Sequence, residues 1–183
     1  MRVIAGEARG RPLRAPKGSA TRPTSDRVRE AIFNMLGSHL DLHGMRVLDL
    51  FAGSGALGVE ALSRGAAEVV FVDHDAVARQ VIVENLRATG FSDRAVVRGG
   101  DATLPWPDEA VLFDVAFCDP PYRFDEWHDL LVGLAATWVV VESDREFALP
   151  PGWELVRAKQ YGSTVVLLAR RGSPAVTMSA EQE

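Results

Sequence analysis

From residue 46 onward, short apolar runs alternate with segments in which apolar side chains recur every three or four positions. Continuous apolar runs such as Val69-Val70-Phe71-Val72 are typical of strands buried on both faces of a sheet. The amphipathic segments between them predict helices that pack against a parallel sheet. The expected strands cover 46–50, 68–73, 95–98, 112–118, 138–142, 153–160 and 163–170, and the expected helices cover 56–64, 76–89 and 125–136.

This alternation predicts an α/β fold. Right-handed crossover connections between parallel strands would give it a doubly wound layout. The last two apolar runs are joined only by Tyr161-Gly162. A connection this short forms a tight turn, so we expect the final strand to run antiparallel to its neighbours.

The first 36 residues follow a different pattern. Residues 1–16 predict two short strands, and residues 17–24 a loop rich in Gly, Ser, Thr and Pro. A helix capped by Thr24 or Ser25 should run to about Leu36, because apolar residues there recur at helical spacing. We therefore expect a hairpin-and-helix extension over 1–36, a main domain over 37–171 and a flexible tail over 172–183.

Composition narrows the class of protein. At 183 residues, 47% hydrophobic and 25% charged, the chain suits one well-buried domain. No apolar run approaches a membrane span and no signal-peptide core is visible, so we expect a cytoplasmic protein. The single cysteine, Cys118, follows an apolar run and is expected to be a packed core thiol. No Cys/His cluster has the spacing of a metal site.

Charge is distributed unevenly along the chain. The net charge is −5, but eight basic residues against three acidic ones give residues 1–30 a charge of +5, which leaves −10 for the rest. A basic arm on an acidic body favours an anionic partner, because guanidinium groups fork onto phosphate oxygens. A merely solvated tail is the alternative. The basic residues are Arg2, Arg9, Arg11, Arg14, Lys17, Arg22, Arg27 and Arg29.

A glycine-rich segment, Gly53-Ser54-Gly55-Ala56-Leu57-Gly58, fits the pattern G-x-G-x-x-G. It follows an expected strand, opens an expected helix and precedes Asp73 at the tip of the next strand, as in nucleotide-binding folds. Asp73 could accept both ribose hydroxyls, and Asp49 could orient the loop or accept from an ammonium group. A purely structural strand-to-helix turn is the alternative. The cofactor candidates are Asp49, Phe51, Ala52, Gly53, Ser54, Gly55, Asp73, His74, Asp101 and Ala102.

The glycine pattern alone does not separate a dinucleotide from S-adenosylmethionine. Asp101 follows the third expected strand, where it could accept from an adenine amino group while Ala102 supplies a backbone donor. Use of this third strand tip favours the methyl donor. A plain cap of the following turn is an equally good interpretation of Asp101 on residue type alone.

Asp119-Pro120-Pro121-Tyr122 ends the fourth expected strand. An exocyclic amine of a nucleobase is a poor nucleophile because its lone pair is spread into the ring. The Asp119 carboxylate and the Pro120 carbonyl could accept its two hydrogens and stabilise developing positive charge. The prolines would hold the loop rigid, and Tyr122 could stack on the base. These four are the catalytic candidates; a Pro-Pro turn with an aromatic plug is the alternative.

Together with these motifs, Arg2-Val3-Ile4-Ala5-Gly6, Arg9-Gly10-Arg11, the segment 22–34 and Glu60-Ala61-Leu62-Ser63-Arg64-Gly65-Ala66 resemble the RsmD family of bacterial 16S ribosomal RNA guanine-N2 methyltransferases. The resemblance runs from residue 2 to about 170. It implies a Rossmann-like class I fold with seven strands and a reversed last strand, S-adenosylmethionine as donor and a guanine of 16S rRNA as target, within a 30S subunit or assembly intermediate. Asp73 stands where the family often has glutamate, and residues 123–127 are less distinctive.

The resemblance also implies that the basic arm and the helix over 22–34 contact RNA and help to wall the active site. No membrane or obligate protein partner is expected. The RNA-binding candidates are Arg2, Arg9, Arg11, Arg14, Arg22, Thr24, Arg27 and Arg29.

Other functions compete with this interpretation. A DNA adenine- or cytosine-N methyltransferase, or a protein glutamine methyltransferase, could use the same tetrapeptide, although no separate target-recognition domain is visible. A nicotinamide-dependent oxidoreductase shares the glycine pattern but leaves Asp119-Pro120-Pro121-Tyr122 without a role. An inactive RNA-binding protein could have kept the fold, and a labelled-methyl assay would distinguish it.

Overall fold

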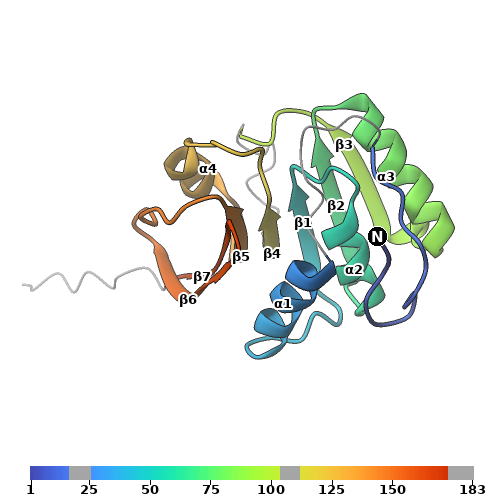
Figure 1. The fold of residues 1–183 in the computed structure, drawn as a ribbon, viewed down its shortest axis with the longest axis horizontal. Coiled ribbons are helices and arrows are strands. Elements are labelled where there is room, and N and C mark those ends of the chain that lie inside the picture. Colours follow the sequence, from blue (N-terminus) through green and yellow to red (C-terminus); the bar gives the residue numbers. More distant parts are fainter. Residues whose placement is uncertain (17–25, 104–111, 173–183) are drawn as a thin grey trace, which may run out of the picture.

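The protein is described here by a computed structural model that covers residues 1–16, 26–103 and 112–172. Its centre is a seven-stranded sheet with the strand order β3-β2-β1-β4-β5-β7-β6 (Figure 1). The α/β fold predicted from the alternating pattern is confirmed. The strands are β1 (Arg46–Leu50), β2 (Glu68–Asp73), β3 (Ala95–Gly99), β4 (Phe113–Cys118), β5 (Ala136–Ser143), β6 (Trp153–Tyr161) and β7 (Thr164–Arg171).

The first five strands are parallel to one another, and β7 runs against both of its neighbours, β5 and β6. The predicted reversal of the last strand is therefore correct. Gly162, at φ 62°, lies in the turn between β6 and β7. Because β7 is inserted between β5 and β6, this turn reaches the same edge of the sheet as the carboxyl end of β5, where Ser143 pairs with Val165.

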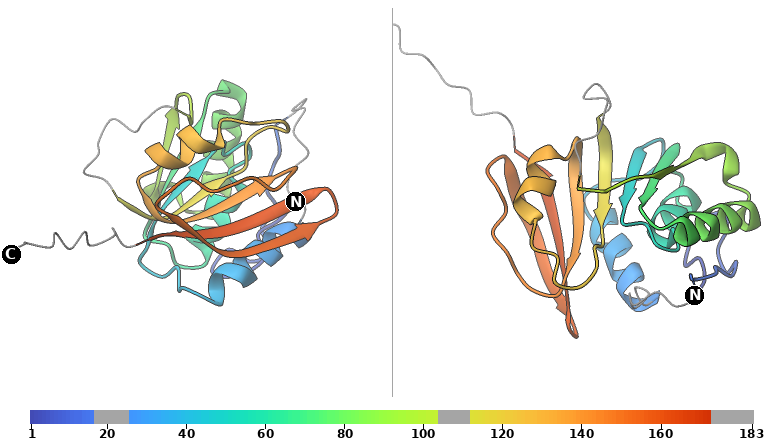
Figure 2. Two further views of the ribbon diagram at one scale, coloured as in Figure 1. Left: turned by 90° about the vertical axis from the view of Figure 1, so that its left-hand side faces the viewer. Right: turned by 90° about the horizontal axis from the view of Figure 1, so that it is seen from above.

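Helices cover both faces of the sheet (Figure 2). The helices are α1 (Asp26–Gly37), α2 (Ala56–Ser63), α3 (Ala76–Thr89) and α4 (Trp127–Gly133), with a 3-10 turn at Ser92–Arg94. Buried side chains of α1, α2 and α3 share one cluster with alternate strand residues such as Val47 and Phe71. Those of α4 share a second cluster with the intervening residues, such as Leu48 and Val70. Both faces of β1 and β2 are thus buried, as their continuous apolar runs predicted.

The largest differences from expectation lie around α4 and in the N-terminal segment. The helix expected over 125–136 is shorter, because Leu134 is extended and Ala136 already pairs with Phe113 of β4, so β5 begins before 138. The two strands expected within 1–16 reduce to a single antiparallel bridge between Arg2 and Pro12. Proline has no N–H to continue a ladder, which limits this pairing.

The N-terminal segment is nevertheless firmly attached to α2. The buried carboxylate of Glu60 accepts hydrogen bonds from the Ile4 and Ala5 N–H groups at 2.7 and 3.0 Å. Gly6 lies so close to this helix that a Cβ there would stand 1.8 Å from the Ser63 carbonyl oxygen, so only glycine fits. The division into 1–36 and 37–171 stays a prediction, and the tail predicted from 172 lies almost wholly outside the described residues.

Candidate active site

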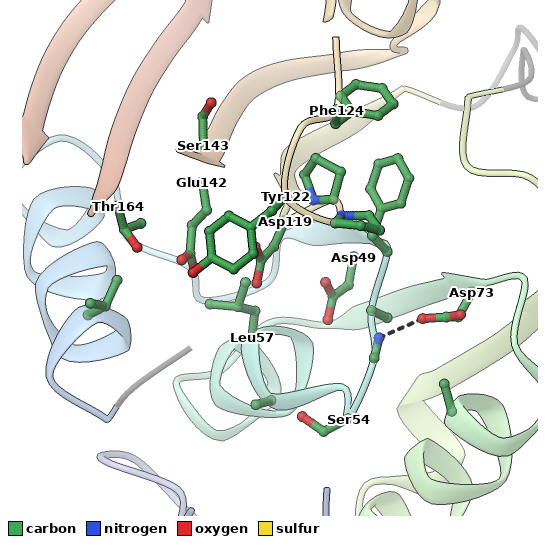
Figure 3. A pocket seen from close by; sticks show the side chains of 18 of the residues that line it. Asp49, Ser54, Leu57, Asp73, Asp119, Tyr122, Phe124, Glu142, Ser143 and Thr164 are labelled. Carbon is green, nitrogen blue, oxygen red and sulfur yellow. Dashed lines mark hydrogen bonds between the residues drawn. The ribbon is translucent and has the colours of Figure 1, made fainter. Parts of the chain in front are cut away.

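A cavity of about 600 Å³ lies at the carboxyl ends of the central strands (Figure 3). Such a volume falls within the roughly 300–1,000 Å³ typical of small-molecule sites. It opens where β1 and β4 are neighbours although β2 and β3 intervene in sequence. This is the topological switch point at which open α/β sheets bind ligands. We call its two sides the β1–β2 half (Asp49, Phe51, Gly53, Asp73) and the β4–β5 half (Asp119 to Phe124, Glu142).

The loop after β1 is shaped by its backbone. Phe51, Gly53 and Gly55 have φ values of 58°, 54° and 72°, and the first of these is unusual for a residue with a side chain. Such strain in a non-glycine residue clusters at ligand sites. The Asp49 carboxylate accepts the Gly58 N–H at 2.9 Å, which fixes the start of α2. A Cβ on Gly58 would stand 2.3 Å from the Phe71 ring, so the helix packs on β2 only through glycine.

Asp73, at the tip of β2, is held by two backbone groups. One carboxylate oxygen accepts the Gly53 N–H at 2.7 Å (dashed line in Figure 3), and the other accepts the Asp75 N–H at 2.8 Å. Each carboxylate oxygen has a second lone pair. Asp73 can therefore both anchor the glycine loop and accept hydroxyl groups of a ligand. His74 follows it, lines the cavity and is largely exposed.

The cavity is acidic. Its described lining contains six carboxylates, against Arg123 and His74 as basic side chains. Burial raises the pKa of Asp49 well above its usual value, and the neighbouring Asp119 and Asp73 carboxylates raise it further. A cation placed here would relieve that repulsion. The carboxylates are Asp49, Asp73, Asp75, Asp119, Glu142 and Asp144.

The tetrapeptide Asp119-Pro120-Pro121-Tyr122 lines the opposite side of the same cavity. Asp119 is partly buried and the Tyr122 side chain is 52% exposed, so its ring is accessible to a ligand. In Figure 3 the carboxylates of Asp49 and Asp119 and the ring of Tyr122 surround one space. The next residue, Arg123, has φ 73°, a second strained position at the cavity rim.

Several lining residues carried no signal in the sequence. Glu142 comes from the end of β5 and is only 7% exposed, and Thr164 comes from the start of the reversed β7. An aromatic group stands behind the tetrapeptide: Phe124 meets the rings of Phe51 and Trp127 edge-on at 5.5 and 4.8 Å. The helix α1 contributes Val28, which agrees with the expectation that this helix walls the site.

Not every predicted site residue reaches the cavity. Asp101 and Ala102 lie outside its lining. The exposed Asp101 carboxylate accepts the Thr103 N–H and hydroxyl at 2.9 and 2.7 Å, and these two bonds lower its pKa. This is the local capping role that residue type alone left open, and contact with adenine stays a prediction. Cys118 is 1% exposed and burial raises the pKa of its thiol, as expected of a core residue.

The basic residues of the N-terminal arm fall into two groups, those whose side chains interact within the protein and those that are exposed. The prediction that Arg29 contacts RNA is wrong for this fold, because its side chain is fully buried and donates to the Arg2 carbonyl and the Asp26 carboxylate at 2.6 and 2.7 Å. Arg11 donates to the Ala88 carbonyl and Arg14 pairs with Glu84, both at 2.8 Å. Arg2, Arg9 and Arg27 are exposed, and Arg22 and Thr24 lie outside the described residues.

Two negative findings concern the described residues alone. Within 1–16, 26–103 and 112–172, no group of His, Cys, Asp and Glu side chains could hold a metal ion. No helix in those ranges is long and apolar enough to cross a membrane.

A family described as "Conserved hypothetical protein 95" matches residues 1–170. The chain belongs to this family. Ribosomal RNA small subunit methyltransferase D of Escherichia coli K12 is 38% identical to it over 181 residues, covering 93% of this chain and 90% of that protein. The same-named protein of Haemophilus influenzae is 34% identical, covering 88% and 89%. The resemblance to the RsmD family is thus confirmed.

A solved structure from Escherichia coli, provisionally named the methyltransferase yhhF, has a TM-score of 0.82 against this chain at 35% identity. The match covers 95% of this chain and 99% of that one. The fold is therefore the Rossmann-like class I arrangement expected from the resemblance.

Proposed function

We propose that this protein transfers a methyl group from S-adenosylmethionine to the exocyclic N2 of a guanine in 16S ribosomal RNA. The observation that carries the proposal is the meeting of the two motifs. One side of the cavity is lined by Asp119-Pro120-Pro121-Tyr122. The other side is lined by Asp49, Asp73 and the glycine loop after β1, which are far from the tetrapeptide in sequence. The family relatives named as small-subunit rRNA methyltransferases support the RNA as substrate.

The β1–β2 half fits S-adenosylmethionine better than a dinucleotide. Asp73 offers acceptors for ribose hydroxyls, and a cation beside Asp49 would favour the charged form of this carboxyl group, whose pKa burial raises. The donor carries a sulfonium and an ammonium group, which an acidic lining attracts. A pyrophosphate would instead meet six carboxylates. This charge argument disfavours the nicotinamide-dependent alternative.

When bound, the cofactor supplies an electrophilic methyl group on sulfur. The chain's own residues prepare the nucleophile. The Asp119 carboxylate and the Pro120 carbonyl oxygen accept from the two hydrogens of a guanine NH2, localise the lone pair on nitrogen and stabilise the charge that develops there. Tyr122 stacks on the base. The strained loop at Arg123 and the proline pair hold these acceptors in position.

Guanine N2 is paired in a duplex, so the target base must be unstacked before it can enter the site. A small-subunit particle or assembly intermediate is the proposed substrate, because such particles present rRNA in a fixed fold. DNA or a protein glutamine remains chemically compatible with the tetrapeptide. The relatives' names, and not the cavity, favour rRNA over these targets.

The test uses tritiated S-adenosylmethionine and small subunits from a strain that lacks the gene. We expect label at one guanine of 16S rRNA, and digestion of the RNA should release the label as N2-methylguanosine. Small subunits from the parent strain are the control, because their site is already modified. Label at another position or in protein, or no label with any ribosomal substrate, would overturn the proposal.

A further inference from the structure

A second groove lies beside the cavity, between α1 and the edge strand β6. Its volume is about 380 Å³, and it is lined by cationic and polar side chains of both elements. Tyr161, at the end of β6, lines both this groove and the cavity, so the two adjoin at this residue. The groove is formed by Arg27, Glu30, Ala31, Asn34, Met35, Ser38, Arg157, Lys159 and Tyr161.

The groove presents positive charge although the net charge of the protein is −5. Arg27 of α1 faces Arg157 and Lys159 of β6 across it, and Glu30 is the one carboxylate among the described residues that line it. All three cations are exposed, and none forms an ion pair with a carboxylate in the described part of the chain. They differ in this from Arg14 and Arg29, each of which forms an ion pair with a carboxylate of the protein.

The side chains are also arranged in a way that suits a polyanion. The Lys159 ammonium group stands 5.2 Å from the centre of the Tyr161 ring, which places a cation at the junction of groove and cavity. Asn34 of α1 and Ser38, just beyond the end of this helix, add polar side chains to the same wall. Phosphates strung along a nucleic acid strand would meet charge on both walls.

We propose that this groove, with Arg157 and Lys159 as its β6 wall, holds the phosphate backbone of the RNA strand that flanks the target nucleotide. The inference rests on the proposed function and adds Arg157 and Lys159, which lie outside the basic N-terminal arm, to Arg27, which belongs to it. The groove and the cavity adjoin at Tyr161, so the strand would pass this residue on its way from the groove to the base held over Asp119. The groove contacts only backbone, so it provides affinity and direction but not sequence discrimination.

The test compares the double variant Arg157→Gln/Lys159→Gln with Arg87→Glu. Both change the net charge equally, and Arg87 lies exposed at the far end of α3, away from the cavity. We measure affinity for deproteinised 16S rRNA against salt, and methyl transfer to small subunits. For the groove variant we expect at least tenfold weaker RNA binding and a salt slope lower by about 1.4, as for two lost single-strand phosphate contacts. S-adenosylmethionine affinity and turnover at saturating RNA should be unchanged.

Each other result counts against the proposal. RNA binding and salt slope equal to those of Arg87→Glu would overturn it. Normal binding of deproteinised rRNA with impaired use of intact small subunits would mean that the groove contacts a ribosomal protein instead. If the unmodified protein methylates no rRNA, the proposed function fails and this inference falls with it. If the unmodified protein is active and the double variant equals it, only the groove assignment fails.

Discussion

In the β1–β2 half of the cavity the carboxylates of Asp49 and Asp73 accept hydrogen bonds from main-chain N–H groups, at 2.9 Å and at 2.7 and 2.8 Å. In the β4–β5 half Tyr122 is 52% exposed and Arg123 has a strained backbone conformation. The acceptors of the first half are thus held by hydrogen bonds within the protein, whereas the second half presents accessible surface. This difference agrees with the proposed function, in which the first half binds a small cofactor and the second half binds a large RNA.

The largest expected effect is on the β4–β5 half. Asp119→Ala should lower turnover by roughly 10²–10³-fold, as for loss of one transition-state hydrogen bond. S-adenosylmethionine affinity should stay within about threefold. Single-turnover methyl transfer and calorimetry measure the two quantities. Asp119→Asn, which keeps one acceptor oxygen, is the matched variant, and turnover near normal in Asp119→Ala would refute the role.

The next effect concerns the backbone fit of the β1–β2 half. Gly58→Ala should lower the free energy of unfolding by about 3 kcal/mol, since its Cβ would stand within 3 Å of both Phe71 and Val69. Denaturant melts measure this change. Gly133→Ala, where a Cβ meets nothing within 4 Å, is the control. Equal stability of the two variants would show that α2 can shift away from β2.

A smaller effect is expected at Tyr122. Tyr122→Ala should weaken RNA use by roughly 1–3 kcal/mol, the range for loss of one stacked base, and appear as a raised KM for small subunits. Tyr122→Phe keeps the ring and should behave as the unmodified protein. If phenylalanine fails as alanine does, the hydroxyl and not stacking is responsible.

The smallest effect tests the electrostatics of Asp49. A carboxyl group whose pKa is raised in the folded state binds more protons there than in the unfolded chain. Stability therefore falls as pH rises from about 3.8 to the raised pKa. Asp49→Asn cannot titrate, so the stability of this variant relative to the unmodified ligand-free protein should rise with pH across this window. Thermal unfolding of both proteins at several pH values measures this difference in stability. A difference that does not change with pH would contradict the prediction.

The same two halves separate what sequence could predict from what it could not. Asp49, Gly53 and Asp73 lie on consecutive elements, and short-range spacing places them together. Glu142 and Thr164 reach the cavity only because β5 lies beside β4 and β7 is inserted next to β5. Nothing in their local sequence indicates a ligand. Strand order is a property of the whole sheet, so this part of the site required the structure.

Arg29 illustrates a different failure. Charge count placed it among the RNA contacts, yet it is buried with Ile32, Phe33 and Leu36 on one face of α1. These four positions follow the i, i+3, i+4, i+7 pattern, so the spacing already indicated an inward face. An arginine with apolar neighbours at that spacing was better interpreted by its place on the helix than by its charge. Arg27, two positions earlier, is exposed and keeps its predicted role as a proposal.

The insertion of β7 between β5 and β6 has a consequence for the order in which the protein can fold during its synthesis. The turn at Tyr161 to Thr164 completes the cavity wall only after β7 has paired with β5, and β7 extends to Arg171. A chain emerging from the ribosome folds progressively from its N-terminus. The glycine loop after β1 can therefore form early, while the finished cavity must wait until synthesis has passed Arg171, so a product truncated before β7 would lack this part of the cavity wall.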